Sequence, residues 1–287
     1  MRSIPKPTDV FQDVFNLCVE GVGDAGLRQR YVDIGQALGA DAAAYEVLAS
    51  QGSLWAIPPN NQGKDEVVVG QVSKSELKKL YSGYMAVQEK PARTVYDRLM
   101  SSAPGEMCPY CGVGRVATLD HYLPKAKFPR LAIAVENLVP ACRDCNMGGK
   151  KTAVATNAES QPIHPYYDAI YFNREQWLFC EVIATVPATV RYYSDPPQAW
   201  SETNKQRTGA HLLSFDLISR FSFQAAEELS HIRQIFVTYY RGATPDERRD
   251  YLLEKEFAES LLHPNSWKRA MYQALSGSLW YCGGGYQ

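Results

Sequence analysis

Two Cys-x-x-Cys pairs in the middle of the chain constrain its fold more than any other feature. Cys108 and Cys111 form the first pair, and Cys142 and Cys145 form the second, about thirty residues later. Four thiolates at this spacing match the ligand number and arrangement of tetrahedral structural zinc sites. The sequence therefore predicts a small domain in which one structural Zn²⁺ ion joins two segments that are distant in the chain.

The other cysteines do not require disulfides. A chain of 287 residues can bury a hydrophobic core without them. Cys18, Cys180 and Cys282 lie far apart in apolar stretches, and we expect each to be a small buried side chain. With 45% hydrophobic and 21% charged residues, the composition is that of a globular protein.

The chain start and its apolar runs bear on its location. The segment Met1–Lys6 lacks the apolar core of a signal peptide. No apolar run approaches the roughly twenty residues that a membrane-spanning helix needs. A cytoplasmic protein is therefore expected.

Charge is distributed unevenly along the chain. The formal net charge of −1 argues against a protein that coats nucleic acid with its whole surface. The segment 108–152 is nevertheless basic, because only Asp120, Glu136 and Asp144 oppose its cations. A local phosphate-binding surface is one interpretation, and a solvated loop is the other. The basic residues are Arg115, Lys125, Lys127, Arg130, Arg143, Lys150 and Lys151.

Helical patterning surrounds this basic segment. Apolar spacing and capping residues predict helices over 9–20, 27–48, 73–87, 92–100, 215–240, from 245 onward, and 265–275. Glycine, proline and amide residues over 51–70 indicate a loop or lid, and β-branched and aromatic residues over 177–193 indicate a hairpin broken at Pro187. The glycines at 283–285 are expected to form a frayed tail.

The central segment reads as strand, strand, helix. The first strand is expected over 116–119, the returning strand over 137–140, and the helix over 142–151. Zinc would tie the start of the helix to the turn before the first strand. This geometry brings Asp120 and His121 close to Asn146.

At this point a resemblance to a known family becomes specific. The chain has Cys-Pro-Tyr-Cys at 108–111, Leu-Asp-His-Tyr-Leu-Pro-Lys at 119–125, Asn-Leu-Val-Pro-Ala-Cys at 137–142 and Cys-Asn at 145–146. This pattern resembles the HNH endonucleases, the ββα-metal (His-Me) finger nucleases. It is most similar to the bacterial branch with two zinc knuckles, many of whose members belong to anti-phage defence systems or mobile elements. Weaker echoes are Leu80-Tyr81, Tyr96-Asp97 and the segment 163–168.

The resemblance implies a role for each polar residue. His121 matches the general base, and Asn137 matches the residue that orients its ring. Asp120 and Asn146 match the ligands of one catalytic Mg²⁺ or Mn²⁺ ion, which hard oxygen donors favour. Because the third motif residue is Asn146, the chain would be an HNN variant. The zinc held by Cys108, Cys111, Cys142 and Cys145 would be structural only.

Nucleic-acid contacts and the other histidines are assigned less specifically. The candidate phosphate contacts are Lys125, Lys127, Arg143, Lys150 and Lys151. His164 is a candidate additional ligand or phosphate contact, with packing in an aromatic cluster as the alternative. His211, His231 and His263 are expected to be structural.

The predicted fold class is α+β and predominantly helical, with a zinc-containing ββα (HNH) finger embedded in a helical body. Three regions are expected to pack as one unit: an N-terminal helical region (1–103), the nuclease finger (104–170), and a hairpin with C-terminal helices (171–287). The predicted function is a hydrolase, a DNA endonuclease of antiviral defence or of a mobile element.

Two other functions remain open. One is an RNA- or tRNA-cleaving effector with the same finger, because aromatic residues in the segment could stack bases. The other is a zinc-finger nucleic-acid-binding module without catalysis. The expected partners are DNA or RNA, a protein such as a defence-system ATPase is a further candidate, and no membrane partner is expected.

Overall fold

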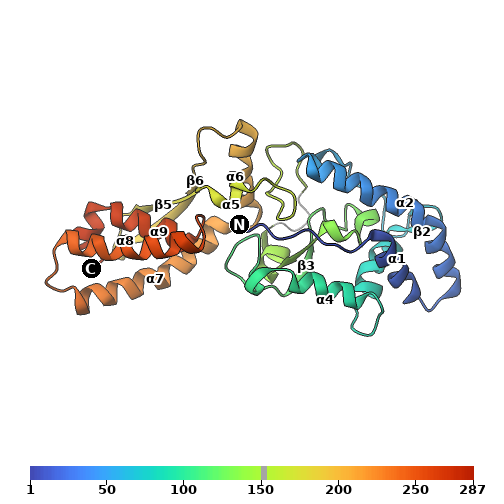
Figure 1. Ribbon diagram of the computed structural model, residues 1–287, viewed down its shortest axis with the longest axis horizontal. Coiled ribbons are helices and arrows are strands. Elements are labelled where there is room, and N and C mark those ends of the chain that lie inside the picture. Colours follow the sequence, from blue (N-terminus) through green and yellow to red (C-terminus); the bar gives the residue numbers. More distant parts are fainter. Residues whose placement is uncertain (150–153) are drawn as a thin grey trace. The chain divides into compact units, whose positions relative to one another are not determined.

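The computed structural model describes residues 1–149 and 154–287, which divide into two compact units (Figure 1). The N-terminal unit is Arg2–Asp168, and the C-terminal unit is Ala169–Gln287 together with Met1. The sequence-based division at 103/104 does not separate compact units in the structure, because buried residues of the first hundred share one core with the central hairpin. The observed boundary at 168/169 lies near the expected one at 170/171.

Helices form the body of the N-terminal unit, close to where apolar spacing predicted them. They are α1 (Phe11–Glu20), α2 (Ala25–Ser50), α3 (Lys74–Lys79) with its π-helical continuation η2 (Leu80–Met85), and α4 (Arg93–Ser101). The predicted capping box of α3 is confirmed, because the Ser73 hydroxyl accepts from the Glu76 N–H and the Glu76 carboxylate accepts from the Ser73 N–H.

The segment 51–70 is more ordered than a simple loop. It contains the short 3₁₀ helix η1 (Leu54–Ala56), and it ends in a small hairpin of β1 (Val67–Val69) and β2 (Val72–Ser73). The β-branched residues of β1 are only partly buried. Such a short strand gives too few alternations to stand out from a polar, glycine-rich neighbourhood.

The central hairpin pairs β3 (Thr118–His121) with β4 (Leu138–Ala141) in antiparallel register. The observed strands start and end later than predicted, so Asp120 and His121 lie within β3 and not after it. After β4 the structure describes a single π-helical turn, η6 (Asp144–Gly149), where a longer helix was expected. The end of that predicted helix lies outside the described residues.

The core of the N-terminal unit joins these elements. Val14 from α1, Leu38 from α2 and Leu80 from η2 are buried in the same cluster as Leu119 of β3 and Leu138 of β4. Burying these side chains contributes on the order of 2 kcal/mol each. The helices therefore hold the hairpin from one side.

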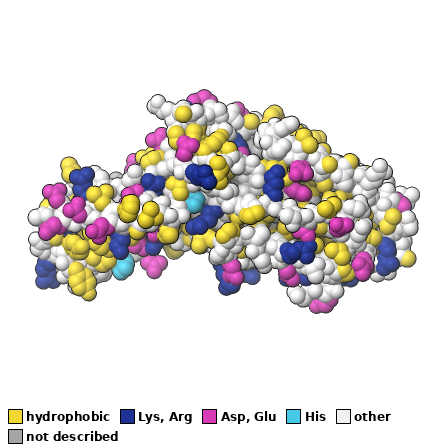
Figure 2. Space-filling view, in the orientation of Figure 1, with side chains coloured by type: hydrophobic (Ala, Val, Ile, Leu, Met, Phe, Trp, Pro, Cys, Tyr) yellow, Lys and Arg dark blue, Asp and Glu magenta, His cyan; other side chains and the backbone are white. Residues whose placement is uncertain are grey.

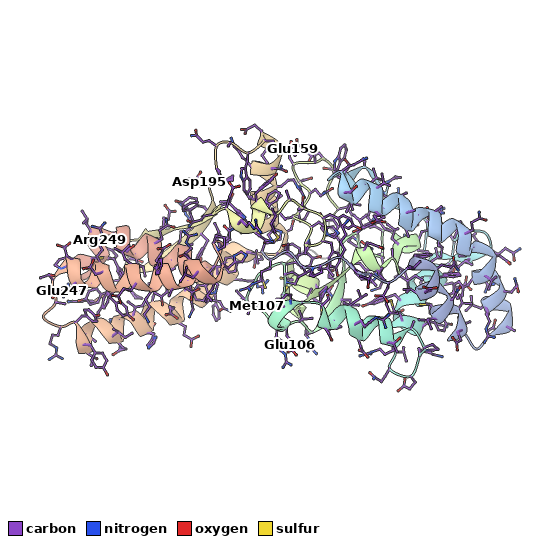
Figure 3. All side chains as sticks on the ribbon, in the orientation of Figure 1. Glu106, Met107, Glu159, Asp195, Glu247 and Arg249 are labelled. Atoms are coloured by element: carbon purple, nitrogen blue, oxygen red, sulfur yellow. The ribbon has the colours of Figure 1, made fainter. Side chains whose placement is uncertain are left out.

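The C-terminal unit is a hairpin covered by helices. As predicted, β5 (Leu178–Ile183) and β6 (Thr189–Ser194) pair in antiparallel register. Helix α7 (Leu217–Tyr239) packs on β6, and α9 (Trp267–Gly277) packs on β5 and on α8 (Pro245–Leu262). The predicted start of α8 is confirmed, because Thr244 forms a capping box with Glu247, the member of the pair that Figure 3 labels.

Two features of the C-terminal unit differ from expectation. Helix α6 (Glu202–Ser214), which follows the short α5 (Tyr171–Arg174), was not predicted, because its buried face includes Arg207, Thr208 and His211 and so lacks an apolar pattern. The predicted frayed tail is wrong: residues Tyr281–Gly285 form the turn η7, and Tyr286 is buried. None of the helices in the described part of the chain is both long and apolar enough to cross a bilayer.

Candidate metal centre and the Asp120–His121 site

The four cysteines of the two pairs converge in the N-terminal unit. The sulfur atoms of Cys108, Cys111, Cys142 and Cys145 all lie within 4.8 Å of one another, and all four side chains are buried. Zn–S bonds of about 2.3 Å place sulfurs about 3.8 Å apart around a tetrahedral ion. The Cys111 and Cys142 sulfurs are 3.9 Å apart. The donors, their number and their spacing therefore fit a structural metal ion such as zinc.

Local backbone geometry forms the first half of this centre. Met107, labelled in Figure 3, pairs with Arg115 in an antiparallel bridge. Inside that bridge the Cys108 N–H donates to the Gly114 carbonyl at 2.8 Å, and the Gly112 N–H donates to the Cys108 carbonyl at 2.8 Å. Gly112 has a φ of +68°, a conformation that favours glycine. The turn directs both sulfurs of the first pair to one point.

Gly114 brings the second pair close to the first. A Cβ atom at this position would lie 2.7 Å from the Cys142 sulfur, so only glycine allows this approach. The Gly114 N–H also donates to the Cys111 sulfur at 3.3 Å. The second pair follows β4 directly, and the Asn146 N–H donates to the Cys142 carbonyl at 3.1 Å.

Contacts among the four thiols shift their pKa values in opposite directions. Hydrogen bonds from Cys108 lower the pKa of Cys111 and lower that of Cys142 to about 7. The corresponding contacts raise the pKa of Cys108 and of Cys145. A divalent cation bound among the four sulfurs would stabilise every thiolate.

His121 lies at the end of β3 and is buried. Its Nε2 atom lies 2.9 Å from the carbonyl oxygen of Ala132. A carbonyl only accepts hydrogen bonds, so Nε2 carries the proton and Nδ1 is the basic nitrogen of the neutral ring. Tyr81, from η2, packs edge-on against the imidazole with ring centroids 4.5 Å apart.

Asp120 precedes His121 and is also buried. The Tyr110 hydroxyl donates to its Oδ2 atom at 3.2 Å. The Asn146 amide donates to the Thr118 hydroxyl at 3.1 Å. Alternate residues of a strand project from the same face, so Asn146 lies on the face of β3 that carries Thr118 and Asp120. Two of the predicted cation ligands therefore belong to one face.

Tyr81 connects the environments of Asp120 and His121. Its ring contacts the imidazole, and its hydroxyl donates to the Leu119 carbonyl at 3.3 Å. Burial raises the pKa of Tyr81, and the charge of Asp120 adds to that rise. The phenol thus stays protonated beside both residues.

Lys125 is the predicted phosphate contact that lies nearest to this environment. Its ammonium group lies 4.6 Å from the Tyr81 ring centroid. Burial lowers the pKa of Lys125, the nearby charge of Lys78 lowers it further, and Asp120 opposes the change. A second basic side chain, Arg93, stacks on Tyr96 at 4.5 Å. Sequence analysis missed Lys78 and Arg93, because they lie on α3 and α4 outside any motif.

Asn137 is fully buried and fastens the loop between the strands. Its side-chain oxygen accepts from the Leu123 N–H at 2.7 Å, and its amide nitrogen donates to the carbonyls of Leu123 and Leu131 at 3.1 and 3.2 Å. Residue Leu131 directly precedes Ala132, whose carbonyl contacts His121. The side-chain hydrogen bonds of Asn137 thus go to the loop that carries the Ala132 carbonyl, and the expected role of Asn137 in orienting the ring stays a prediction.

His164 packs inside an aromatic cluster. Its Nε2 atom lies 3.0 Å from the Tyr45 hydroxyl, and its Nδ1 atom accepts from the Tyr166 N–H at 3.1 Å. The Tyr122 ring lies 4.1 Å away. Both nitrogens take part in structural contacts, so the geometry favours the packing alternative. Among the aromatic residues that could stack on bases, four are buried and Tyr167 is partly buried; the buried four are Tyr110, Tyr122, Phe128 and Tyr166.

The remaining basic residues of the segment 108–152 have separate environments. Arg115 pairs with Glu106 and Arg130 with Asp41, whereas Arg143 is exposed. Lys127 is partly buried. Lys150 and Lys151 lie outside the described residues. On the face that Figure 2 shows, basic and acidic side chains are interspersed.

Together these features define an α+β protein built around a buried four-cysteine cluster suited to a structural metal ion. The chain is 33% identical to protein ea31 of Escherichia phage lambda over 291 residues, which cover 97% of this chain and 98% of the relative. The chain therefore belongs to the protein ea31 family. No family model matches the sequence, and no solved structure matches it.

Proposed function

We propose that this protein is an HNH-type endonuclease that hydrolyses DNA with one divalent ion and is braced by structural zinc. One observation carries the proposal. The hairpin that carries the four-cysteine centre also carries two consecutive buried residues, Asp120 and His121. The His121 Nε2–H is directed at a backbone carbonyl, and the Asn146 amide lies on the strand face of Asp120. A hairpin with only a structural role would not need a buried imidazole, carboxylate and amide together.

His121 would act as the general base. Its Nε2–H donates to the Ala132 carbonyl, which leaves Nδ1 as the nitrogen that takes a proton from the attacking water. When the ring is protonated, the same carbonyl stabilises the positive charge at Nε2. The Tyr81 ring limits rotation of the imidazole, so the base is held in one orientation.

Asp120 and Asn146 would hold the catalytic Mg²⁺ or Mn²⁺ ion. A carboxylate and an amide oxygen are hard donors, and two such ligands leave positions for water and phosphate. The ion, when bound, would supply Lewis-acid stabilisation of the phosphate and of the leaving oxygen. The Tyr110 hydroxyl orients the carboxylate by donating to Oδ2.

Basic side chains near the site would neutralise the substrate. The Lys125 ammonium group lies over the Tyr81 ring, and burial and the charge of Lys78 lower its pKa. A phosphate group would raise that pKa again, because an adjacent anion favours the ammonium ion. The exposed Arg143 and the partly buried Lys127 would extend this contact along a strand.

The setting proposed is phage-related. The relative named above is a phage protein, which supports a role in a mobile element or in anti-phage defence. The RNA-cleaving alternative has less support, because most of the aromatic side chains that could stack on bases are buried and Tyr167 alone among them is partly exposed.

The test is cleavage by the purified protein of supercoiled DNA, linear DNA and RNA, with Mg²⁺ and Mn²⁺ supplied in turn. His121→Ala is expected to reduce DNA cleavage by roughly 10²–10⁴-fold, because the general base is lost. Zinc content and the melting temperature should change little. His231→Ala is the matched control, since that histidine is exposed on α7.

Each outcome decides between the functions. Undiminished cleavage by His121→Ala would exclude the proposed mechanism. Preferred cleavage of RNA would support the effector alternative. Metal-independent binding without cleavage of any substrate would support the binding module.

A further inference from the structure

A pocket of about 600 Å³ lies within the N-terminal unit. One wall is helix α2, the second is the loop 56–62, and the third is the segment 127–131, which contains the short helix η4 (Pro129–Leu131). Pockets of about 300–1,000 Å³ are typical of small-molecule sites. The predicted catalytic residues do not line it.

The lining combines three kinds of group. Ile57, Phe128 and Leu131 provide apolar surface. Asn60 and its two successors, Asn61 and Gln62, provide amides that both donate and accept hydrogen bonds. Lys127 and Arg130 provide positive charge, of which the lining carboxylate of Asp41 balances one unit by pairing with Arg130. A ligand that matches all three has a flat apolar part, hydrogen-bonding edges and an anionic group.

We propose that this pocket binds a nucleotide, with the base against the apolar wall and the phosphate at Lys127 and Arg130. An amide side chain can pair with two edge atoms of adenine at once, and guanidinium groups bind phosphate well. A simple anion would use only the cations, and an apolar ligand would leave them unmatched. Adenine nucleotides are therefore the probe that the lining favours.

The walls are held in place before any ligand arrives. Arg130 donates through Nε to Asp41 of α2 at 2.6 Å, so an anion can be bound by the terminal nitrogens of the guanidinium. The Asn60 N–H donates to the Lys127 carbonyl at 2.7 Å, and the Lys74 ammonium donates to the Asn60 carbonyl at 3.1 Å. Contacts within the protein thus join the segment 127–131 both to α2 and to the loop, which lowers the ordering cost of binding.

One polar atom in the pocket wall lacks a hydrogen-bond donor. The side-chain oxygen of Asn60 is buried and has no hydrogen-bond partner among the described residues. A buried acceptor without a donor costs about 1–3 kcal/mol. The exocyclic amine of a base is the kind of donor that would satisfy it.

Trp55 allows a direct measurement of binding. It immediately precedes the lining residue Ala56, it is 37% exposed, and it is the only tryptophan within residues 2–168. The zinc-loaded His121→Ala protein, in which cleavage would not interfere, is titrated with AMP, adenosine, inorganic phosphate and a 5′-phosphorylated oligodeoxyadenylate. AMP should change Trp55 fluorescence and bind at least tenfold more tightly than adenosine or phosphate. Trp55→Phe should remove the signal.

Matched variants test the location. Ala44→Phe places a bulky side chain in the pocket and should weaken AMP binding at least tenfold, whereas Ala43→Phe, on the same helix outside the pocket, should not. The double variant Asp41→Asn/Arg130→Gln removes both members of the ion pair and should reduce the advantage of AMP over adenosine, since Lys127 alone then faces the phosphate. Melting temperatures show whether each variant is folded.

The possible results separate the sources of the ligand and decide the inference. Tight binding of the oligonucleotide but not of AMP would assign the pocket to a strand of nucleic acid. Equal affinity for AMP and phosphate, no binding of any probe, or unaltered binding by Ala44→Phe and the double variant would overturn the inference. Binding is measured without cleavage, so this result is independent of the proposed nuclease activity.

Discussion

The central hairpin carries two polar centres of opposite character. The cysteine centre consists of four soft sulfur donors, all buried, that converge on one point. The Asp120–His121 site consists of hard oxygen and nitrogen donors on the two faces of β3, and each has a specific hydrogen-bond partner. A closed set of thiolates suits a structural role, whereas oriented hard donors suit a chemical one. Under the proposed function, the cysteine centre would stabilise the hairpin and the Asp120–His121 site would carry out the reaction.

The two centres also differ in where their residues come from. The cysteine centre is built from two short turns on the hairpin itself. The other site depends on residues that are distant from it in sequence. Lys78 comes from α3, and Tyr81 comes from η2. Removing a residue from the first centre should therefore unfold the hairpin, and removing one from the second should mostly alter function.

Loss of one cysteine ligand gives the largest expected effect. Cys145→Ser should abolish tight zinc binding and unfold the central hairpin, since structural zinc contributes on the order of 10 kcal/mol to the folding of small sites. Zinc content by mass spectrometry and amide hydrogen exchange over 107–145 measure the two consequences. Cys180→Ser, in the C-terminal unit, is the control and should keep its zinc. Retention of zinc and of exchange protection in Cys145→Ser would refute a structural role for the centre.

Asn137→Ala tests the link between the loop and the imidazole. Leu123 and Leu131 would lose three hydrogen bonds in a fully buried environment, which should lower the free energy of unfolding by about 3 kcal/mol. The Ala132 carbonyl would shift as well, so the proposed cleavage should slow more than zinc binding weakens. Urea denaturation, plasmid cleavage and zinc titration measure the three quantities. Asn16→Ala, on the exposed face of α1, should leave all three unchanged.

The cysteine centre could be predicted from sequence, and much of the second site could not. The spacing of ligands within each Cys-x-x-Cys pair is a local property of the sequence. The convergence of the two pairs on one ion could therefore be predicted from that spacing. The environment of His121 depends on which helix packs over β3, and a single sequence does not specify such long-range contacts. Lys78 and Arg93 therefore went unnoticed, although they lie on helices whose existence was predicted correctly.

The same distinction explains the errors in secondary structure. Helices with an apolar face, such as α1 and α7, were predicted within a few residues. Helix α6 buries polar and charged residues, which hydrophobic periodicity cannot detect. The C-terminal glycines were expected to be a free end, but they form the turn η7, and the following Tyr286 packs on Phe236 of α7. Tertiary contacts decided each of these cases.

Glu136→Gln gives the smallest expected effect, and it contrasts with its neighbour Asn137. Asn137 has every hydrogen bond satisfied, whereas the Oε2 atom of Glu136 is buried with no partner among the described residues. Burial raises the pKa of Glu136, Glu46 and Asp9 raise it further, and Lys6 opposes them. The folded state therefore binds more protons than the unfolded state, so the native protein loses stability as pH rises through the raised pKa.

Glutamine removes that titration, so the increase in melting temperature that Glu136→Gln produces should be larger at pH 8 than at pH 5. A rise of about 2 °C in melting temperature at the upper end is expected for a change of roughly 1 kcal/mol or less. Glu89→Gln, the same change at an exposed position, should show no pH-dependent gain. A gain that is equal at both pH values would mean that the carboxylate is solvated in the folded protein. In that case the segment before β4 opens to water, and the hairpin is held by the cysteine centre and Asn137 alone.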